Sequence, residues 1–321
     1  MEGTVCACGA SALELYRSSK RLIPTLLDKP RTGQVAGLAI PPRQFLEDDM
    51  SAHGVTERPY HVLVDGNRGY NPRQDIHAVA CYQPLPPRSL IKIDSDFWTT
   101  GPELTFIQVC GDESWSDLDV ISLGYELCGT YVLDDSWDGL TCIETPPTSI
   151  EKIGRLINSI HRVTGVKRAR DLVRHVHNLS NSPMETILAM LISLPTTKGG
   201  LGLDPISLNY PVSTPVGQRR VDIAFPKQRV GLEYQGKEFH SIEAAGRDAR
   251  RQNKIVGSGF TILNVWYEDL ADEHLFQQLV TDLFRALGIR MRIRVTGYHT
   301  LQKLLRMHLM PAIKAYGSNE F

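Results

Sequence analysis

Two acidic residues in the second half of the chain have the spacing to bind one cation together. Asp222 lies in residues 219–225 and Glu233 in residues 229–234, and both runs alternate apolar and polar side chains. Alternation with period two is typical of β-strands, and the short turn between the runs predicts a β-hairpin. With residues 227 and 228 in that turn, Asp222 pairs directly with Glu233. The predicted apolar face then holds Val221, Ile223 and Phe225 opposite Tyr234, Leu232 and Val230.

A pair of directly opposed carboxylates needs a physical reason. Their Cβ atoms lie roughly 5 Å apart, and like charges at that distance destabilise a sheet. A divalent cation removes the repulsion: Mg²⁺ takes oxygen ligands at about 2.0–2.1 Å and often uses one or two carboxylates with phosphate oxygens and water. Such an ion can activate water against a phosphodiester. The prediction depends on the register, because a slip of one residue would separate the two side chains.

The alternative is a sheet face exposed to solvent. There, Asp222 and Glu233 would each form a separate ion pair with a neighbouring base. The candidate bases are Arg220, Arg229 and Lys237.

The segment before the hairpin brings a third acidic residue. Residues 182–193 predict a helix, since Ser182 suits the N-cap and Pro183 the first turn. Glu185 then occupies the N3 position, where its side chain completes a capping box. The pattern by itself assigns Glu185 a capping role.

The segment after the hairpin predicts a crossover. Residues 241–256 are basic and helical in pattern, and Gly257 and Gly259 end that helix. Residues 260–266 then form an apolar strand. A strand, a helix and a second strand in this order pair the two strands in parallel. A last helix, residues 272–287, is expected to cover the sheet.

Several short motifs follow one another through this region. They are Pro183-Met-Glu185, Arg220-Val-Asp222-Ile-Ala-Phe-Pro226, Val230-Gly-Leu-Glu233-Tyr-Gln-Gly236, His240, Arg247-Asp-Ala-Arg-Arg251 and Gly259-Phe-Thr-Ile-Leu263. Together they resemble the endonuclease-like domains related to very-short-patch-repair endonucleases, which belong to the PD-(D/E)XK superfamily. The resemblance implies an α/β chain whose N-terminal part is α+β. It also implies a C-terminal PD-(D/E)XK, restriction-endonuclease-like α-β-β-β-α-β core with a mixed sheet.

The resemblance also implies roles for individual residues. Asp222 and Glu233 would bind Mg²⁺ or Mn²⁺, Glu185 would act as an accessory acid, and DNA would contact the basic helix. The implied catalytic residues are Asp222, Glu233, Gln235, Lys237, Glu185 and His240. The implied nucleic-acid contacts are Arg220, Arg247, Arg250, Arg251 and Lys254.

Gln235 departs from the pattern of the relatives, where an Asp or a Lys is frequent. A neutral amide can orient a water molecule but cannot act as a general base near pH 7. Lys237 could supply the positive charge that stabilises the transition state. His240 could instead cap the following helix, and Arg247 with Asp248 could form a charge pattern within that helix.

The composition, 42% hydrophobic and 22% charged residues, is that of a soluble globular protein. No stretch approaches the roughly 20 apolar residues that span a bilayer. The first residues show no basic start followed by an apolar run, so a cytoplasmic protein without membrane association is expected. Six scattered cysteines predict ordinary thiols rather than a disulfide framework.

Charge is distributed unevenly along the chain. Residues 151–321 hold 24 Lys and Arg against 15 Asp and Glu, whereas residues 1–150 hold 11 against 21. The basic part could meet a polyanion such as DNA, or the two parts could dock on one another. The acidic part could also bind a protein partner.

Four segments are predicted. They are an acidic α+β domain of unknown role over residues 1–147, a helical connector over 148–181, the endonuclease-like domain over 182–288 and a basic C-terminal tail over 289–321. The tail could be a DNA-contacting arm or a helix packed on the domain. Through the run Leu104–Gly129, the first segment weakly resembles actinobacterial abortive-infection or type IV antitoxin-like proteins.

These features favour a metal-dependent DNA endonuclease, in a repair, mobile-element or phage-defence context. The alternative is a catalytically inactive nucleic-acid-binding or antitoxin-like regulator that keeps the nuclease fold. The neutral Gln235 is the feature that favours the alternative.

Overall fold

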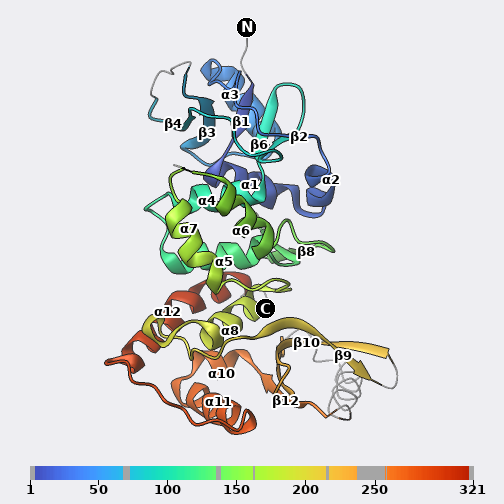
Figure 1. Cartoon of the computed structure of the whole chain (residues 1–321), viewed down its shortest axis with the longest axis vertical. Helices are drawn as coiled ribbons and strands as arrows, with labels where there is room; N and C mark the ends of the chain where they lie inside the picture. The colour runs from blue at the N-terminus through green and yellow to red at the C-terminus, as the bar shows by residue number, and fades with distance from the viewer. Residues whose placement is uncertain are drawn as a thin grey trace. The chain divides into compact units, whose positions relative to one another are not determined.

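The computed structural model describes residues 4–67, 73–134, 139–161, 163–214, 217–236, 257 and 259–317. The chain divides into two compact units, Met1–Asn178 and Leu179–Phe321 (Figure 1). Both units combine helices with sheets, which confirms the α/β class in general terms. Most of the segment predicted as a helical connector, residues 148–181, belongs to the first unit, because its helices α6 (Ile150–Ser159) and α7 (Val166–Leu172) pack on α4 (Pro102–Cys110).

The first unit is built on a six-stranded mixed sheet of order β2-β5-β6-β1-β3-β4. Its strands are β1 (Val5–Ala7), β2 (Arg31–Thr32), β3 (Tyr60–Asp65), β4 (Ile76–Cys81), β5 (Leu90–Lys92) and β6 (Phe97–Thr100), with the separate hairpin β7 (Tyr131–Asp134) and β8 (Gly139–Cys142). Its helices are α1 (Gly9–Ser19), α2 (Ile23–Leu27), α3 (Arg43–Ala52), α4 (Pro102–Cys110), α5 (Asp117–Leu127), α6 (Ile150–Ser159) and α7 (Val166–Leu172), with the 3-10 turns η1 (Lys20–Leu22) and η2 (Val173–His175).

A partly buried ion pair joins two helices of this unit. Arg17 on α1 donates from Nη2 to Glu126 Oε2 on α5 at 2.8 Å and from Nε to Oε1 at 3.1 Å. Glu126 Oε1 also accepts the main-chain N–H of Leu133 at 3.2 Å, so β7 is attached to the same carboxylate. The six cysteines are free thiols, four of them buried, as the sequence predicts.

The second unit contains a four-stranded sheet of order β12-β11-β10-β9. Its strands are β9 (Ser207–Thr214), β10 (Gly217–Phe225), β11 (Val230–Tyr234) and β12 (Thr261–Val265). Its helices are α8 (Pro183–Ser193), α10 (Tyr267–Ala271), α11 (Glu273–Ala286) and α12 (Tyr298–Gly317), with the 3-10 turn η3 (Thr196–Lys198).

The strands of this sheet pair in a mixed pattern. β10 is antiparallel to both β9 and β11, whereas β11 and β12 are parallel, which confirms the predicted parallel pairing. The helix predicted between them, residues 241–256, lies outside the described residues. The sequence did not predict β9 as a strand. Pro211 interrupts its strand pattern, and the strand accommodates proline because it lies at the edge of the sheet.

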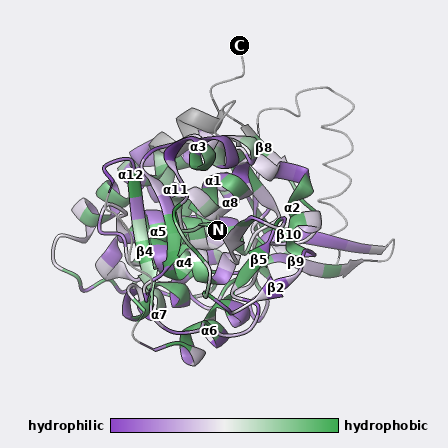
Figure 2. Ribbon diagram, turned by 90° about the horizontal axis from the view of Figure 1, so that it is seen from above, coloured by the Kyte–Doolittle hydropathy of each residue, from purple (hydrophilic) through white to green (hydrophobic). Residues whose placement is uncertain are grey.

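Hydrophobic residues are spread over the helices and strands, as the hydropathy colouring shows (Figure 2). Within the described ranges, the chain has no helix with the length and apolar character needed to cross a membrane.

The predicted basic tail is, from residue 298 on, the helix α12, which packs on α8 and α10. Arg306 on this helix is buried, with 6% of its surface exposed. It donates from Nη1 to the carbonyl oxygen of Leu270 at 3.1 Å and from Nη2 to Glu273 Oε2, and it lies 4.8 Å from the ring centroid of Phe276. Of the two roles left open for this segment, the packed helix is therefore the one observed.

Replacing Arg306 with alanine should lower the free energy of unfolding of the second unit by about 2 kcal/mol, since it removes buried hydrogen bonds and a cation–π contact. Lys303 is exposed on the same helix and provides a matched control, Lys303→Ala, with an expected change below about 0.5 kcal/mol. Urea denaturation followed by circular dichroism measures both. Equal effects of the two substitutions would show that Arg306 does not anchor α12.

Candidate active site

The hairpin that carries the two acidic residues has the predicted register. The observed pairs are Ile223 with Leu232, Ala224 with Gly231, and Phe225 with Val230. Asp222 and Glu233 come next in this register, beyond the last of the observed pairs. There the main-chain N–H of Tyr234 donates to the side-chain oxygen Oδ2 of Asp222 at 2.9 Å. This carboxylate oxygen takes the place of the main-chain carbonyl oxygen that accepts such an N–H in a regular ladder. Asp222 and Glu233 therefore lie directly beyond the last main-chain pair between β10 and β11.

The other side of β10 is interrupted at the same residue. Pairing with β9 runs from Gly217 to Val221 and resumes at Ile223, and the position opposite Asp222 is Asn209. Asn209 has a φ of 47°, in the left-handed region that asparagine tolerates better than most residues. Main-chain pairing is therefore interrupted at Asp222 toward both neighbouring strands.

This interruption corrects one expectation about the hairpin. Val221 was predicted to share the face of Ile223 and Phe225, but it lies in the same buried cluster as Ala224. A Cβ added to Gly231, the partner of Ala224, would lie only 2.5 Å from Cγ1 of Val221. The alternation therefore shifts at Asp222, because the irregular main chain beside Asn209 breaks the period of two.

Glu185 lies at the start of α8 with its carboxylate buried, 8% of the residue being exposed. Its main-chain N–H donates to Ser182 Oγ at 3.2 Å, which confirms Ser182 as the N-cap. Its side-chain Oε2 accepts the N–H of Asn181 at 3.0 Å and Nδ2 of Asn209 at 3.1 Å. The Glu185 side chain therefore accepts the N–H of Asn181 in place of the Ser182 N–H expected for a capping box, and it also reaches across to β9.

The protonation of Glu185 is strongly perturbed. Burial first, and then the negative charge of Asp222, raise the pKa of Glu185 to about 8. The hydrogen bonds from Asn181, Asn209 and Ser182 act in the opposite direction. Asn209, a hydrogen-bond partner of Glu185, stands opposite Asp222 in the β9–β10 register, so the charge of Asp222 acts on Glu185 from the neighbouring strand.

Glu233 and Gln235 extend the site along β11. Glu233 is 8% exposed and is aligned with Asn264 on the parallel strand β12. Gln235 continues the ladder through its N–H to the carbonyl oxygen of Val265 at 2.8 Å, and its Nε2 donates to Asn264 Oδ1 at 2.9 Å. Because the amide nitrogen binds Asn264, the carbonyl oxygen is the atom of Gln235 suited to accept a hydrogen bond from water.

Arg220 lies two residues before Asp222 and is exposed. Its Nη1 donates to the carbonyl oxygen of Asn209 at 3.2 Å, which holds a positive charge at the edge of the opened sheet. The remaining predicted site residues lie outside the described residues: Lys237, His240, Arg247, Arg250, Arg251 and Lys254.

Carboxylate and amide oxygens are the ligand types that Mg²⁺ and Mn²⁺ prefer, so Glu185, Asp222, Glu233 and Gln235 form a suitable donor set. Within the described part of the chain, no group of three or more His, Cys, Asp or Glu side chains is already arranged around a common ion position. A site of two carboxylates completed by water and phosphate is compatible with both observations.

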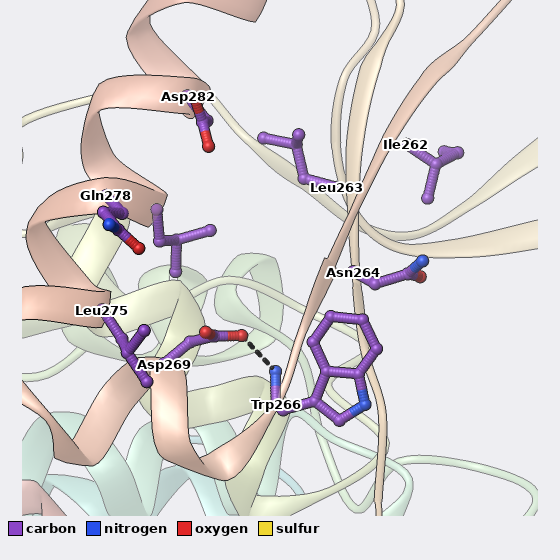
Figure 3. A pocket seen from close by; sticks show the side chains of 9 residues that line it. Ile262, Leu263, Asn264, Trp266, Asp269, Leu275, Gln278 and Asp282 are labelled. Carbon is purple, nitrogen blue, oxygen red and sulfur yellow. Dashed lines mark hydrogen bonds between the residues drawn. The ribbon is translucent and has the colours of Figure 1, made fainter.

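A hollow of about 290 Å³ lies between β12 and α11 (Figure 3). Asn264 and Trp266 line it together with Asp269 and Asp282, and the N–H of Trp266 donates to Asp269 Oδ2 at 2.8 Å. Two carboxylates on its wall disfavour a phosphate group there.

Comparison of the chain with protein families, with curated proteins and with solved structures finds no match. A function is therefore inferred from the residues themselves. Sequence reasoning missed the neutral amides Asn181, Asn209 and Asn264, because nothing in their local sequence distinguishes them from other surface asparagines.

Proposed function

We propose that this protein is a metal-dependent DNA endonuclease of the PD-(D/E)XK kind, with Asp222 and Glu233 as ligands of Mg²⁺ or Mn²⁺. The observation that carries the proposal is the hairpin register, which, continued by one residue beyond Ile223 and Leu232, sets Asp222 opposite Glu233. The buried carboxyl group of Glu185, bound to Asn209 opposite Asp222 in the β9–β10 register, adds support. The order of helix α8, three antiparallel strands and a parallel fourth strand also supports it.

In this proposal the bound cation supplies a water of lowered pKa and charge for the leaving oxygen of the phosphodiester. The protein holds the ligands in place: the N–H of Tyr234 fixes one oxygen of Asp222. Gln235 orients the attacking water through its carbonyl oxygen but takes up no proton near neutral pH. The guanidinium of Arg220 attracts the phosphate backbone toward the opened sheet.

A plasmid assay tests the proposal. Supercoiled DNA incubated with the full chain and Mg²⁺ or Mn²⁺ should be nicked or linearised, and EDTA should stop the reaction. The variant Asp222→Asn keeps an oxygen that can accept the Tyr234 N–H but loses the charge that binds the cation, so we expect it to be inactive. Cutting by both proteins alike, or by neither, would contradict the proposal.

The amide of Gln235 favours a second candidate function, a nucleic-acid-binding regulator that has lost catalysis. Such a protein would bind a DNA fragment with strong salt dependence, and Asp222→Asn would not weaken its binding. Gel-shift assays beside the plasmid assay therefore separate the two functions.

A further inference from the structure

Asn209 on β9 connects the candidate site to three other segments. It is buried, with 4% of its surface exposed. Its Nδ2 donates to Glu185 Oε2 at 3.1 Å and to the carbonyl oxygen of Leu179 at 2.7 Å. Its Oδ1 accepts Nδ2 of Asn181, and its carbonyl oxygen accepts Nη1 of Arg220. Its side-chain amide therefore both donates and accepts hydrogen bonds in the interior.

The main chain of Asn209 explains why this side chain is available to Glu185. It lies opposite Asp222 in the β9–β10 register, but its left-handed φ of 47° removes it from the ladder. A regular strand residue at this position would pair with Asp222 and would close the sheet there. The same residue therefore opens the sheet at Asp222 and holds the carboxylate of Glu185.

We infer that Asn209 is a positioning residue, which holds Glu185 beside Asp222 so that Glu185 strengthens cation binding at this site. The inference rests on the proposed function for the identity of the site. Two N–H donors, from Asn181 and Asn209, occupy Glu185 Oε2. They fix the orientation of the Glu185 carboxyl group, so that it is already in place when cation binding removes its proton.

The substitution Asn209→Gly tests the contribution of the Asn209 side chain separately from that of its main-chain conformation. Glycine adopts a positive φ without strain, so the opening of the sheet is preserved while the amide is lost. Asn181→Ala acts in a complementary way, since it removes a donor to Asn209 Oδ1 and leaves the main chain of β9 unchanged.

Titration calorimetry of the full chain with MnCl₂ tests the inference without requiring catalysis. Asn209→Gly should weaken Mn²⁺ binding about tenfold, as expected for losing one hydrogen bond to a charged group, and Asn181→Ala about threefold. In a Glu185→Gln background, neither substitution should weaken Mn²⁺ binding further, because the carboxylate that Asn209 positions is already absent. Thermal unfolding without metal verifies that each variant is folded.

The outcomes distinguish this inference from the proposed function. A folded Asn209→Gly protein with wild-type Mn²⁺ affinity would overturn the inference but would not contradict the proposed nuclease function. The same holds if Asn209→Gly weakens Mn²⁺ binding equally in the Glu185→Gln background and in the wild type. If Asn209→Gly does not fold, Asn181→Ala decides by the same criteria. Mn²⁺ binding without DNA cleavage would contradict the proposed nuclease function but not the inference about Asn209. A wild-type protein that does not bind Mn²⁺ would contradict both.

Discussion

Replacing Glu233 with glutamine is expected to lower the rate of Mg²⁺-dependent DNA cleavage by about a thousandfold, which corresponds to about 4 kcal/mol of transition-state stabilisation. Glutamine has the size of glutamate, so the packing between β11 and β12 is retained while one negative ligand is lost. We expect a lower affinity for the cation and a less precise orientation of the attacking water. Initial rates of plasmid nicking at saturating Mg²⁺, with Mn²⁺ affinity measured by calorimetry, give the two effects separately.

A matched control is available close by on the same unit. Glu268 is exposed on α10, so Glu268→Gln removes the same charge away from the opened sheet and should leave the cleavage rate within about twofold. Glu233→Gln should also leave the free energy of unfolding within about 1 kcal/mol, since it preserves shape and removes a repulsive charge. A fully active Glu233→Gln protein would exclude Glu233 as a cation ligand.

The second large effect concerns pH and the stability of the metal-free protein. The pKa of Glu185 is 4.5 ordinarily and is raised to about 8 in the folded protein. Between these values the folded protein keeps the proton that the unfolded chain has released, so a rise in pH favours the unfolded chain. The stabilisation is complete below the unfolded pKa and is lost as pH rises through the folded pKa. The expected slope is at most about 1.4 kcal/mol per pH unit in this window.

Urea denaturation at several pH values between 5 and 8 (about the range in which Glu185 titrates) measures this effect. Glu185→Gln should remove most of the slope, because an amide does not titrate and still offers an oxygen to the N–H of Asn181. An excess of Mn²⁺ should reverse the trend, since cation binding requires ionised carboxylates and therefore tightens as pH rises. An identical slope in the wild type and in Glu185→Gln would exclude Glu185 as the source of the pH dependence.

The sequence by itself determined the elements that carry the candidate site. Alternation at period two and the length of the turn fixed the hairpin register, because in a strand every side chain changes face with a shift of one residue. Ser182, Pro183 and Glu185 fixed the start of α8, since capping depends only on neighbours within one turn. The apolar run after residue 259 fixed a strand that pairs in parallel with β11.

Only the tertiary structure decided how these elements meet. Glu185 and Asn209 are 24 residues apart, and Gln235 and Asn264 are 29 apart, so no local pattern reveals that their side chains bind one another. The shift of Val221 away from the face of Ile223 follows from the left-handed residue on the neighbouring strand. The basic charges of α12 gave no sign that Arg306 is buried against α10 and α11. Local sequence encodes local hydrogen bonds, whereas the environment of a buried polar group is set by segments that only folding brings together.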